Sequence, residues 1–295
     1  MLTISVSGLF LTLICATFFA ASDFYRKLAS MKIEPIILLT IFFICQIPVL
    51  GVWLLIQGPS QIANSYWIYG IVTAGFGLLA NLLFLYSLKH SDLSLTIPIL
   101  GLVPMFTTFL GALTLQEIPS LLQNIGITFS VIGLIIIYLP ENSSNPYKAI
   151  KTLIKNKGAR YMLFVAVLWS TTAPLDKICV QQSSASLHGF IQVCIAASGL
   201  LIYNIVFKNY SKKHFNKQYL IYGVFAAIAA SVAYAAQLLA YQLIFVGIVE
   251  SLKRTVGLLS ALILGTVLLK EPLTKKKVKG IILIIIGLPL IMLQL

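Results

Sequence analysis

The sequence predicts an all-α integral membrane protein with ten transmembrane helices, arranged as two inverted five-helix repeats. The first observation is composition: 59% of the 295 residues are hydrophobic and only 10% are charged, too few to coat a soluble protein of this size. The second is the length of the apolar stretches, about 17 to 25 residues each, as a helix needs to cross the hydrocarbon core. The third is an internal repeat with a fixed spacing of 154 residues.

Ten apolar segments follow one another along the chain. They lie near residues 6–26, 35–56, 66–88, 93–115, 120–139, 160–180, 187–207, 219–243, 249–269 and 278–294. Helices are expected because backbone polar groups in a bilayer must be satisfied within the segment. Each half of the chain therefore holds five crossings.

The internal repeat divides the chain into two copies. The residues that return 154 positions later are Leu110-Gly111 as Leu264-Gly265, Glu117 as Glu271, Gly126 as Gly280, and Gly133 as Gly287. A unit with an odd number of crossings places its second copy upside down, and inverted repeats are typical of secondary transporters. We expect a first repeat at 1–139, a basic linker at 140–158 and a second repeat at 159–295.

The basic residues are concentrated in alternate loops. Loops after the first, third, fifth, seventh and ninth segments contain 18 of the 21 lysines and arginines. The positive-inside rule places these loops in the cytosol and both termini outside, in the cell (inner or plasma) membrane. This distribution explains the net charge of +13 without a nucleic-acid partner.

In the linker, Tyr147, Ile150 and Ile154 share one helical face and lysines occupy the rest. This pattern predicts either a short amphipathic helix on anionic cytosolic lipid or a solvated basic loop. Lipid headgroups are thus an expected partner of the basic loops.

Three of the prolines inside predicted crossings lie in the fourth and sixth segments. Pro98 and Pro104 lie in the fourth segment and Pro174 in the sixth. Each removes a backbone hydrogen bond and kinks its helix. Broken helices at membrane depth are tolerated where they are buried in protein or line a cavity, so we expect these two helices to line the transport path.

A charged cluster opens the ninth segment. Glu250 precedes Lys253 and Arg254 at i,i+3 and i,i+4 spacing, which places them on neighbouring parts of one helix face. One interpretation is an interfacial ion pair. The other is that Lys253 or Arg254 binds a substrate carboxylate or phosphate while Glu250 accepts a proton or an amine.

Two aspartates lie near the ends of the first and sixth segments. Asp23 precedes basic residues, and Asp176 precedes Lys177; Lys27 and Lys177, 150 residues apart, form a second trace of the repeat. The aspartates are either parts of snorkelling pairs at the membrane edge or protonation sites for coupling.

Two amides lie within crossings. Asn81 and Gln237 are 156 residues apart, and Tyr234 and Tyr241 flank Gln237 on one helical stripe, with Trp169 as a further aromatic candidate. These amides form either interhelical hydrogen bonds or substrate contacts, and the aromatic residues are either packing or part of the binding site.

The absence of common catalytic motifs argues against an enzyme. The chain has no phosphate-binding loop and no His-Glu-x-x-His pair, and its histidines (His90, His188, His214) are scattered. We therefore expect no catalytic residue, no cofactor and no metal. Glu117 and Glu271 close the fourth and ninth segments, where a carboxylate favours the N-terminus of the next helix, and are expected to be structural.

Several segments resemble EamA-type members of the drug/metabolite transporter superfamily. They are Ser251-Leu252-Lys253-Arg254-Thr255, Leu264-Gly265, Leu268-Leu269-Lys270-Glu271-Pro272-Leu273 and Gly280, with Pro104-Met105-Phe106, Gly111, Glu117 and Gly126 in the first half. The resemblance implies alternating access, without ATP hydrolysis, around a cavity lined mainly by helices one, three, four, six, eight and nine. Better-known bacterial members keep both termini in the cytosol, whereas the loop charges here argue the reverse.

The expected function is secondary transport of a small organic solute, such as an amino acid, a related metabolite or an amphiphilic drug, by exchange or proton coupling. The alternatives are transport of a lipid-linked or phosphorylated solute, and a structural or sensory membrane protein that does not transport. The sequence does not define the substrate or the oligomeric state, since one fold carries many solutes.

Overall fold

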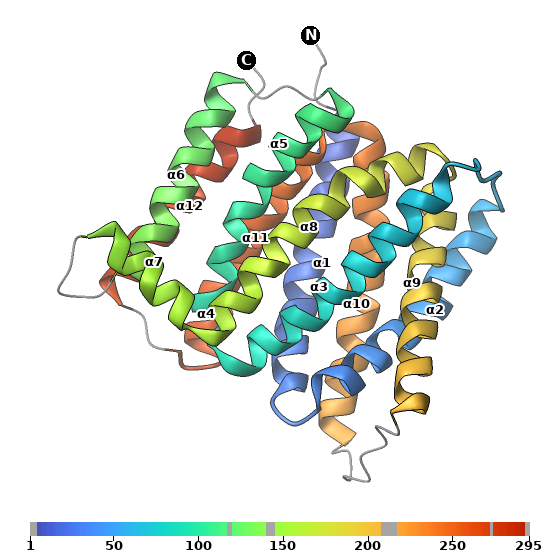
Figure 1. The fold of residues 1–295 in the computed structure, drawn as a ribbon, viewed down its shortest axis with the longest axis horizontal. Coiled ribbons are helices and arrows are strands. Elements are labelled where there is room, and N and C mark those ends of the chain that lie inside the picture. Colours follow the sequence, from blue (N-terminus) through green and yellow to red (C-terminus); the bar gives the residue numbers. More distant parts are fainter. Residues whose placement is uncertain (1–4, 117–119, 140–144, 208–216, 272–273, 293–295) are drawn as a thin grey trace.

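The computed structural model describes residues 5–116, 120–139, 145–207, 217–271 and 274–292, and the regular elements among them are all helical. In chain order they are α1 (Val6–Ser30), α2 (Pro35–Gln57), α3 (Tyr66–His90), α4 (Leu93–Thr96), the 3-10 helix η1 (Ile97–Leu102), α5 (Val103–Leu115), α6 (Leu121–Tyr138), α7 (Pro146–Lys155), α8 (Lys157–Gln181), α9 (Ala185–Val206), α10 (Lys217–Leu243), α11 (Val246–Val267) and α12 (Lys275–Met292). The long helices run side by side as one bundle (Figure 1).

Eight stretches are long and apolar enough to cross a membrane. They are α1, α2, α3, the run from α4 to α5, α6, α8, α9 and α10. The charged residues of α11 and the lysines that open α12 set these two helices apart. The all-helical prediction is confirmed for the described residues.

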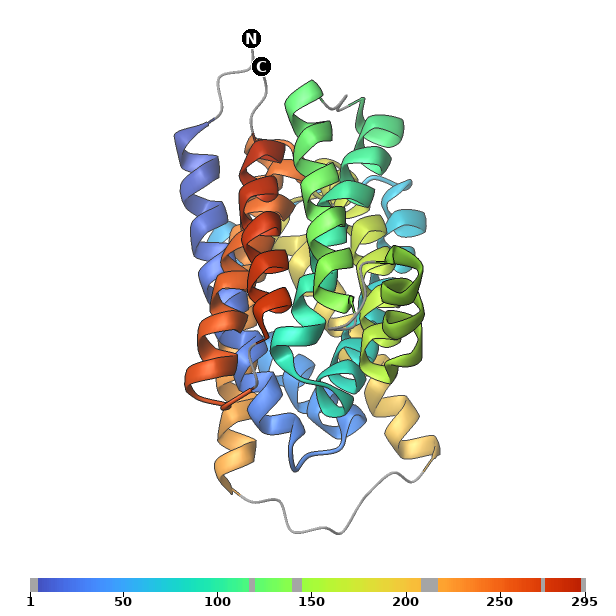
Figure 2. The ribbon, with the colours of Figure 1, turned by 90° about the vertical axis from the view of Figure 1, so that its left-hand side faces the viewer.

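The bundle has two ends with different loops. The described ends of α1 (Val6) and α12 (Met292) lie at the same end, which we call the terminal end (Figures 1 and 2). The opposite end contains the turns after α1, α3 and α11, and we call it the basic end because Lys32, Lys89 and Lys270 lie at these turns.

The repeated glycines explain how the halves pack through α6 and α12, which lie side by side (Figure 2). A Cβ atom on Gly133 would lie 2.6 Å from the backbone oxygen of Gly280, and one on Gly287 would lie 2.6 Å from that of Gly126. Such distances exclude any side chain. Moving each residue of the first contact by 154 positions gives the second contact, so the two helices run antiparallel and are related by a pseudo-twofold axis.

A second pair of contacts follows the same symmetry. Lys27 Nζ donates to the carbonyl oxygen of Leu88 at 2.6 Å, and Lys177 Nζ donates to that of Ile244 at 3.1 Å. The lysines are 150 residues apart and the acceptors 156, which are the spacings of the weaker sequence repeats. The duplication is thus preserved in side-chain contacts.

The fourth crossing is broken as its prolines predict. Pro98 lies in the 3-10 helix η1, and Pro104 lies in the first turn of α5, where a missing N–H costs least. The helix α8, by contrast, continues through Pro174. The segment between α4 and α5 is apolar and packs into a core cluster that includes Leu100, Val103 and Ile284.

Glu271 stabilises the start of a helix that is distant from it in the sequence. Its two carboxylate oxygens accept hydrogen bonds from the backbone N–H groups of Leu93 and Ser94, each at 2.7 Å, at the beginning of α4. Pairing of the halves brings the end of α11 beside α4, which sequence neighbours alone do not indicate. The structural role expected for Glu271 is therefore found at α4, and Glu117 lies outside the described residues.

Candidate functional site

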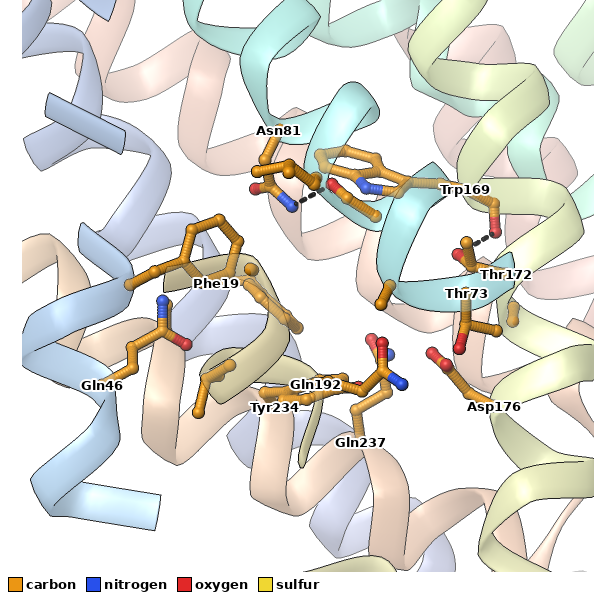
Figure 3. A pocket seen from close by; sticks show the side chains of 18 of the residues that line it. Phe19, Gln46, Thr73, Asn81, Trp169, Thr172, Asp176, Gln192, Tyr234 and Gln237 are labelled. Atoms are coloured by element: carbon orange, nitrogen blue, oxygen red, sulfur yellow. Dashed lines mark hydrogen bonds between the residues drawn. The ribbon is translucent and has the colours of Figure 1, made fainter. Parts of the chain in front are cut away.

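A cavity of about 140 Å³ lies inside the bundle, lined by residues of α1, α2 and α3 from the first half and of α8, α9, α10 and α11 from the second (Figure 3). An apolar cavity of about 150 Å³ in another protein accommodates benzene. This cavity is therefore large enough for a small organic molecule, and polar side chains line much of it: Asp23, Arg26, Gln46, Thr73, Asn81, Thr172, Asp176, Gln192, Gln237, Glu250, Lys253 and Arg254.

Toward the terminal end, Glu250 holds two cations from its own helix. Its Oε1 atom accepts from Lys253 Nζ and, at 2.8 Å, from the hydroxyl of Tyr241, and its Oε2 atom accepts from Arg254 at 3.2 Å. Lys253 also donates to the amide oxygen of Gln237. Glu250 is only 1% exposed, so the pairing offsets a large desolvation cost.

The cluster carries more positive than negative charge. Lys253 and Arg254 share the single carboxylate of Glu250, and the Nε atom of Arg254 is buried without an acceptor among the described residues. The guanidinium lies 5.1 Å from the ring centroid of Trp169. A cationic group with a free donor, held against an aromatic face, is suited to an anionic ligand.

A second acid at the same end is held by a chain of an imidazole and a phenol. Asp176 Oδ1 lies 3.1 Å from Nε2 of His188, and the other ring nitrogen, Nδ1, lies 2.9 Å from the hydroxyl of Tyr66. His188 and Tyr66 are fully buried, whereas Asp176 borders the cavity and points toward Gln237 and Gln192 (Figure 3).

Toward the basic end, one arginine narrows the cavity between two aromatic rings. The Arg26 guanidinium lies 4.8 Å from the centroid of Phe42 and 4.3 Å from that of Phe84. It donates to the side-chain oxygen of Asn81 at 3.0 Å and pairs loosely with Asp23 at 3.7 Å. The arrangement buries a cation by stacking rather than by a close carboxylate.

The family of the chain follows from a comparison with known families. A model of the EamA-like transporter family matches residues 6–139 and matches again at residues 156–293. The chain belongs to the EamA-like transporter family. It is therefore a multi-pass membrane protein of a family of transporters, with one family unit in each half.

Two further similarities concern this EamA-like protein. An uncharacterized protein of Methanocaldococcus jannaschii is 28% identical over 133 residues, which cover 96% of that protein but only 44% of this chain. A relative of about half the length agrees with a duplicated unit. A solved crystal structure is similar over 96% of each chain, with a TM-score of 0.70 and 14% identity, which shows that the fold is shared.

The structure brings together around one cavity every residue that the sequence proposed for substrate binding or coupling. They are Asn81, Trp169, Tyr234, Gln237, Tyr241, Lys253 and Arg254 for binding, and Asp23, Asp176 and Glu250 for coupling. Their roles stay predictions. The placement shows that polar residues within apolar segments were a sound guide to the interior of this EamA-like bundle.

The expectation for the proline-containing crossings needs correction in part: α8 lines the cavity as expected, through residues such as Trp169 and Asp176, but the fourth crossing does not. None of Pro98, Pro104 and Pro174 borders the cavity, and the fourth crossing contributes no lining residue. The broken segment is buried in the core instead, which also satisfies the rule that irregular backbone at membrane depth must be covered by protein. The lining helices implied by the family resemblance are corrected likewise: the second and seventh crossings (α2 and α9) line this cavity and the fourth does not.

Sequence reasoning missed Arg26 and His188 and the lining residues of α2 and α9, such as Phe42, Gln46 and Gln192. A signal existed for His188 and Gln192, which lie inside a predicted crossing where polar groups need partners. No comparable signal marks Phe42, because an aromatic residue in an apolar run has no special pattern.

Proposed function

We propose that this protein is a secondary transporter that moves a small organic solute with a carboxylate group, such as an amino acid or a related metabolite, by alternating access. The central cavity is the proposed binding site. Its position between the two halves is where substrate sites of inverted-repeat transporters are found.

One observation carries the proposal most directly. Two buried cations share one buried carboxylate, and the Nε atom of Arg254 has no acceptor within the described part of the chain. A solute carboxylate next to Arg254 and Lys253 would balance the extra charge and satisfy that donor. Glu250 would then orient the two cations, and an amine would meet Asp23 or Asp176 instead.

The remaining walls suit the apolar part of a solute. Trp169 and Phe19 lie under the cations, with Lys253 Nζ 5.3 Å from the centroid of Phe19. Tyr234 and Gln237 face the same space (Figure 3). Aromatic faces give contact area, and amides and hydroxyls give orientation, as in most small-molecule sites. An amphiphilic drug would use the same surfaces.

For the membrane topology, we propose that α11 and α12 also cross the bilayer, which gives ten crossings in two inverted sets of five. The charges of α11 support this because they face the interior: Glu250, Lys253 and Arg254 are at most 8% exposed, while Ile263 and Val267 are 57% and 68% exposed. The lysines of α12 are confined to its first turn and a half, at the basic end.

We further propose that the protein lies in the inner or plasma membrane with its basic end facing the cytosol. The α7 helix would lie on the lipid surface at that end. Tyr147, Ile150 and Ile154 are exposed, whereas Ala149 is buried against the bundle. An exposed apolar stripe beside lysines is suited to an anionic leaflet. Both termini would lie outside.

The test is a thermal unfolding screen of the detergent-purified protein with amino acids, other carboxylates, phosphorylated metabolites and cations, followed by counterflow of each hit into proteoliposomes. A ligand of the folded state raises the unfolding temperature. We expect carboxylates to be hits and to be lost in Lys253→Gln/Arg254→Gln. The matched control is Lys89→Gln, since Lys89 is an exposed lysine that does not line the cavity.

Other outcomes distinguish the alternatives. Hits restricted to phosphorylated or lipid-linked compounds would favour that substrate class at the same cations. Binding without counterflow of any hit would contradict transport and favour a sensory or structural protein of the same fold.

A further inference from the structure

We propose that Asp176 and His188 form the proton-binding site that drives this transporter, with Tyr66 as the proton relay between the pair and the terminal end. The inference rests on the proposed transport function and adds the driving ion and its residues. It starts from a buried carboxylate, imidazole and phenol joined by hydrogen bonds of 3.1 and 2.9 Å. All three lie within about two turns of helix ends at the terminal end, Asp176 in α8, His188 in α9 and Tyr66 in α3.

These three hydrogen-bonded residues can take up and release one proton, and the charges balance at each step. With a neutral imidazole, Nε2–H donates to Asp176 and Nδ1 accepts from the Tyr66 hydroxyl. A proton arriving from the terminal end binds at Nδ1, and the hydroxyl then turns to accept from Nδ1–H. The pair of Asp176 and His188 changes from one negative charge to none, and loss of the proton restores it. Histidine is suited to this role because it ordinarily titrates between about pH 5 and 8.

The other two acids of the cavity are less suited to exchange a proton. Glu250 is bound by Lys253, Arg254 and the Tyr241 hydroxyl, so a proton would have to displace charged partners. Asp23 faces Arg26. Asp176, by contrast, pairs with neither a lysine nor an arginine in the part of the chain that the structure describes. Its partner is itself a proton acceptor.

The groups that face Asp176 from the surrounding helices define what its charge interacts with. The α3 and α10 helices present the phenols of Tyr66, Tyr234 and Tyr241, and Cys179 follows on α8 itself. The charged or titratable groups that act on Asp176 from other helices are His188 on α9 and Glu250 and Lys253 on α11. Lys177, next to Asp176 on α8, donates to the carbonyl oxygen of Ile244.

This placement couples the proton to the solute. A carboxylate bound at Lys253 and Arg254 would lower the positive potential that Asp176 and His188 experience and favour proton uptake. By reciprocity, the proton would favour the carboxylate to the same extent. Two charge changes within one low-dielectric cavity are strongly coupled.

The position of the three hydrogen-bonded residues also suggests how access to the proton could alternate between the two ends of the bundle. Asp176 and His188 belong to the second half of the molecule, while Tyr66 belongs to the first. A movement of one half against the other would separate Tyr66 from His188 without breaking the Asp176 contact. The proton would then leave toward the opposite end.

Histidine-selective ¹⁵N labelling provides the direct test, because the sequence has only three histidines. The full-length protein in nanodiscs is titrated between about pH 5 and 8, the range of histidine switches, and His188→Gln identifies the signal. We expect the His188 ring nitrogens to change protonation within this range and the midpoint to move in Asp176→Asn. His90, which is exposed, serves as the internal control. A His188 signal that is constant with pH would overturn the proposal.

Transport assays separate this inference from the proposed function. In proteoliposomes, His188→Gln should retain solute counterflow, which needs no net proton movement, and lose accumulation driven by a pH gradient. Retained accumulation, or loss of both activities, would overturn the coupling role. Wild-type protein without counterflow of any solute would instead refute the transport proposal, while the titration of His188 would still decide whether the proton site exists.

Discussion

The two ends of the central cavity are lined by different charged groups. At the basic end, Arg26 lies between Phe42 and Phe84. At the terminal end, Asp176 and Glu250 are buried in hydrogen-bond networks. Arg26 and Asp176 are 150 residues apart, the spacing of the symmetry-related Lys27 and Lys177. Duplication thus accounts for the shared helix arrangement, and substitutions at single positions account for the different charges at the two ends.

The difference between the ends predicts unequal costs of substitution. A network with a central anion fails when that anion is removed, because two buried cations remain unpaired. A cation held by aromatic rings, such as Arg26, keeps these contacts when its loosely paired acid, Asp23, is changed. The free energy of unfolding of the detergent-solubilised protein measures the cost of each substitution.

The largest effect is expected at the terminal end, for Glu250→Gln. The substitution keeps the volume but leaves Lys253 and Arg254 buried without a carboxylate, and should cost about 3 to 5 kcal/mol. Measurement by denaturant titration should show it as a lower midpoint. A cost near that of a surface pair, about 1 kcal/mol or less, would mean that the network contributes little and would break the comparison.

The next prediction concerns what the two ends share. Lys27→Met and Lys177→Met remove charged hydrogen bonds to the symmetry-related carbonyls of Leu88 and Ile244, and Lys27→Met also removes one to the carbonyl of Ser91. Each should cost about 1.5 to 3 kcal/mol, the usual range for hydrogen bonds to charged groups. Similar costs would show that the symmetry-related contacts contribute similarly to stability. A large cost at only one lysine would show that the structural symmetry does not extend to stability.

A smaller effect is expected at the basic end, for Arg26→Lys. The charge is kept, but the planar contacts with Phe42 and Phe84 and the hydrogen bond to Asn81 are weakened. The cost should be about 1 kcal/mol, less than the roughly 2 kcal/mol of a desolvated cation over an aromatic ring, because lysine keeps the charge. Arg26→Gln serves as the comparison variant: if it is no worse than Arg26→Lys, the positive charge is not what the aromatic rings hold.

The smallest effect is expected on the surface, for Glu34→Gln. Glu34 and Lys89 form an ion pair at 2.9 Å between side chains that are 54% and 36% exposed. Such pairs contribute about 0 to 1 kcal/mol and are screened by salt. Unfolding at low and high ionic strength should converge for wild type and variant. A large cost that does not change with salt would show that the exposed fraction of an ion pair does not predict its contribution to stability, at the surface or in the buried networks.

The sequence predicted most of the helices and the residues that gather around the cavity, because a polar group in an apolar segment must find a partner. Asn81, Gln237 and Glu250 were identifiable on that basis. It did not predict that the prolines of the fourth crossing would be covered by core residues, since covering protein and a lining cavity satisfy the same backbone requirement. The partner of Glu271 was equally hidden, because it lies 177 residues away.

The sequence by itself determined the membrane class, the helical segments and the duplication, because these follow from the length of apolar runs and from identities at fixed spacing. Only the tertiary structure decided which charges meet. The contacts between Tyr66 and His188 and between Arg26 and Asn81 join residues 122 and 55 positions apart. Hydrophobicity selects the environment of each helix, but the packing of one helix against another fixes which face is turned inward, and single-residue patterns do not contain that choice.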